Sequence, residues 1–235
     1  TQLLFACNAP FIQSPARLNV RAPGDSPTNE WLLKRVGALS ASVMLAWLRD
    51  SSASVADRSK AYTLVPDLAR DETSLEGTCA AIVQKAFWNA VGEQPFLLTD
   101  DGQLKSKKQS VVIPKELFDV WSPAQVTALL DDESRPAFSR HVSAADRDKL
   151  VRHQAVEAIG KDRVLGVLRS RHLPCPETWR CLMDLWAYVA PEISGYTSPE
   201  SGRNVCILPV QGSDLLHAPS EVVRIGERRL LQAES

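Results

Sequence analysis

Residues 27–50 read PTNEWLLKRVGALSASVMLAWLRD, and this stretch is the best-defined element of the chain. Ser26 precedes it as a helix cap, and Pro27 takes the first helical position, where a missing amide hydrogen costs nothing. Apolar residues recur at intervals of three and four, at Leu32, Val36, Leu39, Val43 and Trp47. This spacing predicts a long helix with that face buried. Gly37 costs about 1 kcal/mol inside a helix, which indicates a close neighbour on its side.

A short strand and a stiff loop are predicted before this helix. Residues 7–17 read CNAPFIQSPAR, and the apolar run at residues 2–7 has the length of a strand that Asn8 and Pro10 would end. Pro10 and Pro15 hold the loop extended. We therefore expect Arg17 to be presented from a rigid segment.

The order Asn-Ala-Pro-Phe, then Pro-Ala-Arg, then a long helix opening with Trp-Leu-Leu resembles the segment after the nucleotide-binding domain of bacterial sacsin-like proteins. Those proteins carry a GHKL-type ATPase module, the fold shared by the ninety-kilodalton heat-shock chaperone, gyrase B, MutL and histidine kinases. The resemblance covers about the first fifty residues. It implies that the chain is an interior piece of a longer protein, a cytoplasmic machine for remodelling or for defence against foreign DNA.

The resemblance also implies where ATP would be bound. An upstream ATP-binding domain of the same chain would hold ATP and Mg²⁺, and Asn8 and Arg17 would lie at the junction with that domain. Arg17 would then reach the γ-phosphate, where a fixed positive charge stabilises phosphoryl transfer. The alternative is that Arg17 pairs with a carboxylate of its own loop, such as Asp25.

Composition predicts a folded protein. Hydrophobic residues make up 44% and charged residues 23% of the chain, near globular averages. The formal net charge of -1 gives no general reason to expect nucleic acid or an anionic membrane as partner. No apolar run approaches the roughly 20 residues of a membrane helix. The five scattered cysteines indicate reduced thiols in a cytoplasmic protein.

The fold class predicted is α+β and mainly α, with capped helices interleaved with two short β-hairpin units. Helix caps are predicted at Ser54, Thr73, Ser122 and Ser143. We expect three segments. Residues 1–66 hold the strand, loop and long helix, residues 67–142 a helix and a hairpin unit, and residues 143–235 further helices and a second hairpin unit.

The two hairpin units resemble each other. Residues 95–113 and 205–225 both run as an apolar strand, a turn with glycine, a leucine, a polar link and a second strand rich in valine. Asp101-Gly102 favours a tight turn, because glycine accepts positive φ. Repeated units of this kind are typical of elongated scaffolds.

Several kinds of catalytic site are excluded by spacing. No two of the 11 glycines lie closer than six positions, so a dinucleotide-binding loop and a Walker A loop are both absent. The chain alone is therefore expected to carry no cofactor and no complete catalytic site. His172, Cys175 and Cys181 were weighed as zinc ligands, but paired cysteine motifs and a fourth ligand are missing, so no metal site is predicted. Asp100-Asp101 and residues 131–133 are interpreted as solvated acidic surface.

Two basic spots remain as candidate binding surfaces: Lys105, Lys107 and Lys108, and Arg224, Arg228 and Arg229. Two functions stay open. The first is a coupling and scaffold region of a sacsin-like ATP-dependent machine. The second is a non-enzymatic module that binds protein or, through these basic spots, nucleic acid, without any link to ATP.

Overall fold

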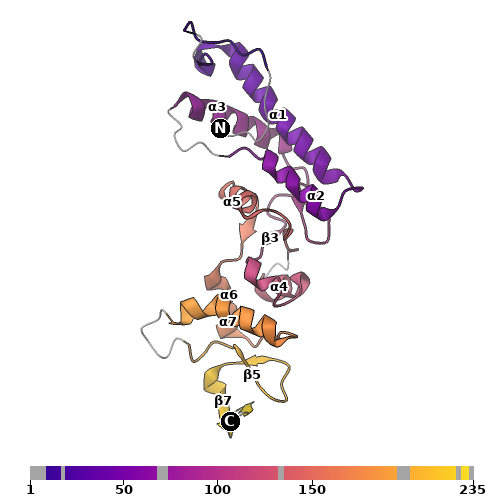
Figure 1. Cartoon of the computed structure of the whole chain (residues 1–235), viewed down its shortest axis with the longest axis vertical. Helices are drawn as coiled ribbons and strands as arrows, with labels where there is room; N and C mark the ends of the chain where they lie inside the picture. Colours follow the sequence, from indigo (N-terminus) through magenta and orange to yellow (C-terminus); the bar gives the residue numbers. More distant parts are fainter. Residues whose placement is uncertain are drawn as a thin grey trace. The chain divides into compact units, whose positions relative to one another are not determined.

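The computed structural model describes residues 9–16, 19–67, 74–131, 135–194, 202–225 and 229–232 (Figure 1). Within these ranges the α-helices are α1 (Pro27–Arg49), α2 (Val55–Ser59), α3 (Leu75–Val91), α4 (Pro123–Leu130), α5 (Ala144–Arg152), α6 (Lys161–Ser170) and α7 (Trp179–Ser194). The 3-10 helices are η1 (Pro23–Asp25), η2 (Lys60–Leu64), η3 (Lys115–Leu117) and η4 (Pro219–Glu221). The strands are β1 (Leu97–Leu98), β2 (Leu104–Lys105), β3 (Val111–Val112), β4 (Glu157–Ala158), β5 (Leu208–Pro209), β6 (Leu216–His217), β7 (Val222–Ile225) and β8 (Arg229–Gln232). The fold is α+β and mainly α, as the sequence predicts.

The chain divides into two compact units. The N-terminal unit comprises residues 1–110 and 139–156, and the C-terminal unit comprises residues 111–138 and 157–235. The three segments expected from the sequence stay a prediction.

Helices α1 and α3 of the N-terminal unit meet at Gly37. A Cβ atom at Gly37 would lie 2.2 Å from the carbonyl oxygen of Val83 and 3.0 Å from Cβ of Ala86. No side chain fits at such distances, so the close contact of the two helices requires glycine. The close neighbour predicted for Gly37 is confirmed.

The buried face of α1 differs from the predicted one. Leu39, Val43 and Trp47 were expected to be buried, but they are 64%, 46% and 37% exposed. The prediction was wrong because the contact with α3 turns Gly37 inward, and residues two or six positions further along a helix face away from it. The residues of α1 that are buried are Asn29, Leu33, Val36, Gly37, Ser40, Ala41, Met44, Leu45 and Leu48.

Helix α3 buries Gly77, Ala80, Val83, Phe87 and Val91. Its cap is Ser74, whose hydroxyl accepts the Gly77 N–H, and the predicted cap Thr73 lies outside the described residues. The caps predicted at Ser54, Ser122 and Ser143 are confirmed.

Tyr62 joins η2 to the β1–β2 hairpin. Its fully buried hydroxyl donates to the Phe96 carbonyl at 2.6 Å and accepts the Leu98 N–H at 2.7 Å. Burial raises the pKa of Tyr62, so the hydroxyl keeps the proton that it donates.

The C-terminal unit has a core of its own, formed by residues from β3, η3, α4, α6, α7 and the segments around β5 and β6. Helix α7 runs from Trp179 to Ser194 with Pro191 inside it. Of its apolar residues, Trp179 is 64% and Met183 48% exposed, while Leu182 and Val189 are buried.

Both predicted hairpins form with a glycine in the left-handed region. Strands β1 and β2 pair antiparallel around Gly102, with φ +83°, and β5 and β6 pair antiparallel around Gly212, with φ +88°. The strands that follow differ. Strand β3 pairs parallel with β4, whereas β7 pairs antiparallel with β8. The two predicted hairpin units therefore resemble each other only in their antiparallel pairs, β1–β2 and β5–β6.

We predict opposite effects for two glycine-to-alanine substitutions in helices. Gly37→Ala should lower the free energy of unfolding by about 1 to 3 kcal/mol, because its methyl group would overpack the contact with Val83. Gly166 of α6 is exposed and has no atom within 4 Å of its would-be Cβ. Gly166→Ala should therefore raise the free energy by about 1 kcal/mol through helix propensity. Urea denaturation followed by circular dichroism measures both, and an unchanged stability of Gly37→Ala would contradict the close contact.

Candidate functional site

The loop before α1 is closed at its base. Residues 12–14 run antiparallel to residues 19–21, with backbone hydrogen bonds of 2.8 Å at both ends of the pairing. Asn8 and Arg17, the two residues singled out from the sequence, lie outside the described residues. What the structure defines is the support of the loop in which Arg17 occurs.

Asn29, in the first turn of α1, fixes this base. Its side chain is buried, and Oδ1 accepts the Ile12 N–H at 2.7 Å. Its Nδ2 donates to the carbonyl oxygens of Ile12 at 2.8 Å and Arg21 at 2.9 Å. One buried amide therefore binds both strands of the loop to the helix, which fixes their position relative to α1.

The far end of α1 is fixed by Arg58 of α2. Its Nε donates to the Leu48 carbonyl at 2.7 Å, and its Nη1 donates to the Gly102 carbonyl at 2.9 Å. Helix α1 thus connects the loop to the turn of the β1–β2 hairpin. Its 23 residues span roughly 35 Å at 1.5 Å per residue.

Helix α1 presents a row of large side chains to solvent, which we call the outer ridge: Trp31, Arg35, Leu39, Val43 and Trp47. The five residues are spaced by four, the spacing of a ridge that packs into a groove of another helix. The Arg35 guanidinium lies 5.7 Å from the centre of the Trp31 ring, so it stacks on the ridge.

Within the described residues, α1 is the helix long and apolar enough to cross a membrane by length and composition. A core helix of a folded protein passes the same test. Because the face of α1 opposite the outer ridge packs against α3 and η2, we treat α1 as a core helix of the N-terminal unit.

The predicted basic residues fall in different units. Lys105, at the end of β2, and Lys107 and Lys108, in the link after it, belong to the N-terminal unit. Arg224 of β7 and Arg229 of β8 belong to the C-terminal unit, while Arg228 lies outside the described residues. Each basic spot therefore stays a separate prediction.

Two of the predicted acidic residues are held by arginines, while Asp132 and Glu133 lie outside the described residues. Asp100 is paired with Arg140 at 3.1 Å. Asp131 was interpreted as solvent-facing, which is wrong, because its side chain is fully buried between Arg135 at 3.0 Å and Arg163 at 3.4 Å. Arg135 follows Asp131 by only four positions, but Arg163 is brought to it by the fold, so the burial could not be predicted from the local sequence.

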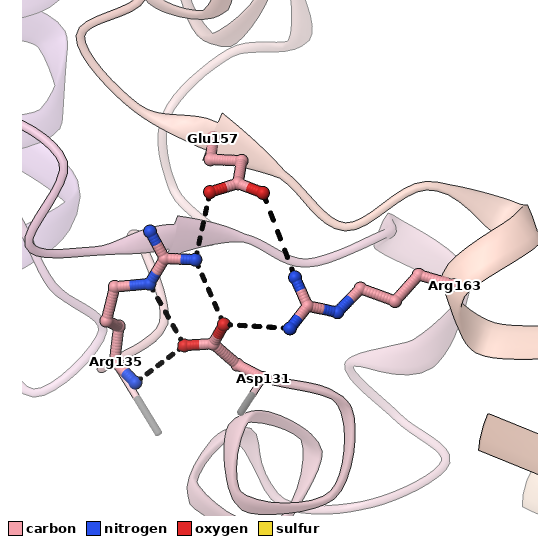
Figure 2. Close-up of polar contacts among 4 residues, drawn as sticks. All are labelled: Asp131, Arg135, Glu157 and Arg163. Carbon is pink, nitrogen blue, oxygen red and sulfur yellow. Dashed lines mark hydrogen bonds and ion pairs between the residues drawn. The ribbon is translucent and has the colours of Figure 1, made fainter. Parts of the chain in front are cut away.

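Figure 2 shows the closed ion network around Asp131. Glu157 contacts Arg135 at 3.0 Å and Arg163 at 3.8 Å, so the two carboxylates and two guanidinium groups alternate. The network joins the end of α4 to β4 and α6. Burial alone would raise the pKa of Asp131, but hydrogen bonds from Arg135 and the charge of Arg163 hold it below its usual value. Since every charge is compensated, we interpret the network as structural.

A different cluster brings together residues that sequence reasoning did not connect. The nitrogen atoms of His172 and His217 and the carboxylate of Glu221 lie within 4.8 Å of one another. His172 does not share this place with Cys181, whose sulfur accepts a hydrogen bond from Thr178 at the start of α7. The spacing His217-x-x-x-Glu221 was a local signal of a candidate ligand pair. The third residue, His172, lies 45 positions before His217, and only the fold brings it to the other two.

No protein-family model, curated protein or solved structure matches this chain. Its function is therefore argued from the geometry of its own residues.

We predict that Asp131→Asn lowers the free energy of unfolding by about 3 to 5 kcal/mol at neutral pH, because it leaves the partly buried arginines without their shared charge. The pKa of Asp131 is lower in the folded chain than in the unfolded one. Its contribution should be complete above the unfolded value near 3.9 and be lost as the pH falls through the lower folded value. Denaturant titrations at several pH values measure this.

The matched control is Glu30→Gln, which removes an exposed pair with Lys34. It should cost no more than about 0.5 kcal/mol. Equal effects of the two substitutions would contradict a special role for the buried network.

Proposed function

We propose that the chain is the coupling and scaffold region of a larger, cytoplasmic, ATP-dependent machine of the sacsin-like kind. In this proposal an upstream domain of the same protein binds ATP and Mg²⁺, and the described part transmits the state of that domain. The observation that carries the proposal is that α1 is fixed at both ends, to the loop by Asn29 and to the β1–β2 hairpin by Arg58.

A helix fixed at both ends moves as one body. Breaking a buried hydrogen bond of the Asn29 type costs about 1 to 3 kcal/mol, because the partner is left without water. The close contact at Gly37 opposes sliding of α1 along α3. A displacement of the loop would therefore be passed to the far end of α1 with little loss.

The chemistry proposed for Arg17 is electrostatic. A cation held by a rigid loop next to a γ-phosphate stabilises the charge that develops during phosphoryl transfer. The support that Asn29 gives to residues 12–14 and 19–21 favours such a role, because it fixes the two backbone segments on either side of Arg17. If Arg17 instead pairs with Asp25, it would have no effect on ATP turnover.

We predict that Arg17→Ala in the full-length protein lowers ATP turnover by about 100-fold or more through loss of a transition-state contact. Asn29→Ala should also lower turnover, since it releases the loop from α1. Steady-state ATP hydrolysis measures both variants, with circular dichroism to show that they fold.

Arg21→Ala is the matched control. Arg21 belongs to the same loop and is exposed, and Asn29 contacts only its backbone carbonyl. Its turnover should equal that of the wild type. Normal turnover of folded Arg17→Ala would contradict the coupling proposal, whatever the result for Asn29→Ala.

A second function, a protein-interaction module without ATP coupling, is favoured by the outer ridge. The residues of the outer ridge are spaced by four, which suits a helix as partner. The cation of Arg35 on the same ridge suits a carboxylate on that helix. We therefore propose an amphipathic helix with acidic flanks as the occupant.

We predict that a synthetic amphipathic helical peptide, with leucines on one face and flanking glutamates, binds the chain through the outer ridge. Leu39→Glu combined with Val43→Glu should weaken binding by more than about tenfold, because two apolar contacts are lost and like charges are placed together. Fluorescence anisotropy of the labelled peptide measures the affinity. Glu30→Gln, beside the ridge, serves as the control. Equal binding by both variants, or none by the wild type, would contradict this surface.

A further inference from the structure

Three side chains with metal-binding atoms meet in the C-terminal unit. Nε2 of His172 lies 3.5 Å from Oε1 of Glu221, and Nδ1 of His217 lies 3.7 Å from Oε2 of the same carboxylate. All three ligand atoms lie within 4.8 Å of one another. Ligand atoms of a tetrahedral zinc ion at about 2.0 Å lie roughly 3.3 Å apart. The two distances to the carboxylate are close to this value, and a closer approach of the two histidines would complete the coordination.

The backbone holds these residues in place. The segment after α6 lies beside β6, where the Leu216 N–H donates to the Leu173 carbonyl at 2.7 Å and Pro174 bridges Leu215. This pairing places His172 next to His217. Glu221 ends η4, and its Oε2 accepts the Ala218 N–H at 3.0 Å.

Each histidine has one ring nitrogen near a hydrogen-bond partner outside the cluster and the other near Glu221. Nδ1 of His172 lies 2.9 Å from the Leu216 carbonyl, which can only accept. In neutral His172, Nδ1 therefore carries the proton, and Nε2 has a free lone pair. Such a carbonyl partner is typical of histidines that bind metals.

His217 has the complementary arrangement. Its Nε2 lies 2.8 Å from the Ser213 hydroxyl, which in turn lies 3.4 Å from the Leu215 carbonyl. When the hydroxyl donates to that carbonyl, it accepts the proton of Nε2, and Nδ1 is left as an acceptor.

Nδ1 of His217 is the unusual atom of the cluster. The side chain of His217 is 7% exposed, and Nδ1 has no hydrogen-bond partner. It faces the partly exposed carboxylate of Glu221, and in the tautomer with the proton on Nε2 its lone pair is directed at that carboxylate. Buried polar atoms of this kind are rare, and an unplaced ion is one explanation for them.

We propose that His172, His217 and Glu221 bind a divalent transition metal, with Zn²⁺ as the ion that fits best. Two imidazoles and one carboxylate suit zinc, and three protein ligands leave a fourth position for a water molecule. A cation between Nδ1 and the carboxylate removes the conflict between the two acceptors.

The fourth position would open to a cavity of about 280 Å³ next to the cluster. His172, Cys206 and Glu221 line it, together with Arg169 and Arg171. The side chains of His172 and Glu221 are 38% and 41% exposed, so an ion can enter from solvent. The two arginines suit a small anionic ligand in the same cavity.

The test is zinc binding by the 235-residue chain, stripped of metal with a chelator and then dialysed against Zn²⁺. The wild type should retain one zinc ion per chain. His172→Ala and Glu221→Gln should each weaken binding, measured by competition with a chromogenic chelator, by more than about 100-fold. This exceeds the roughly 10- to 100-fold expected for Ser213→Ala, which removes only an outer partner.

Co²⁺ gives a second readout. Bound at the same place, it should produce the intense visible absorption of a four-coordinate ion in the wild type and none in Glu221→Gln. Because Glu221 is partly exposed and Gln keeps an oxygen for the Ala218 N–H, this variant is expected to fold.

Two controls distinguish the cluster from other ligands. Cys175→Ala combined with Cys181→Ala removes the thiols near His172 in sequence, and His141→Ala removes an exposed histidine of the N-terminal unit. Both should bind zinc as the wild type does. The proposal is overturned if the wild type retains no zinc, if His172→Ala and Glu221→Gln bind it normally, or if the cysteine variant loses it.

Discussion

The contact between Gly37 and the backbone of Val83 determines how the N-terminal unit is arranged. A Cβ at Gly37 would lie 2.2 Å from the Val83 carbonyl oxygen, so this position has to face α3 and has to be glycine. Once Gly37 faces inward, the rotation of α1 about its axis is fixed. Leu33 and Met44 become core residues, and Leu39 and Val43 become exposed. The outer ridge is thus a consequence of one backbone contact rather than a separate feature.

Features set by neighbouring residues were predictable from the sequence, whereas those set by the contact of α1 with α3 were not. The start of α1 was predictable because Ser26 and Pro27 act locally, and the turns at Gly102 and Gly212 because positive φ favours glycine there. The buried face was not predictable from apolar spacing, since α1 has apolar residues on two faces. Choosing between them requires knowledge of α3, whose Val83 lies 46 positions after Gly37.

Long-range pairing accounts for the other differences. Strand β3 was expected to belong to the first hairpin, but it pairs parallel with β4, 46 positions later in the chain. The burial of Asp131 follows from the same pairing, because Glu157 of β4 and Arg163 of α6 are brought to it. For the candidate sites, the sequence identified the loop of Arg17 but not Asn29, which looks like an ordinary residue of the first helical turn. Its role depends on the backbone of Ile12 and Arg21, which no local pattern reveals.

The two polar clusters of the C-terminal unit, each built around one buried side chain, can be distinguished by how completely their charges are compensated. Asp131 accepts hydrogen bonds from Arg135 at both carboxylate oxygens, and Glu157 closes the network, so nothing further is required. In the cluster of His217 and Glu221, a buried nitrogen without a partner faces a carboxylate. A divalent cation at this place would bind that nitrogen and the carboxylate together with His172, whose carbonyl partner leaves Nε2 free. The first cluster is therefore complete as part of the fold, whereas the second has the arrangement that the proposed cation requires.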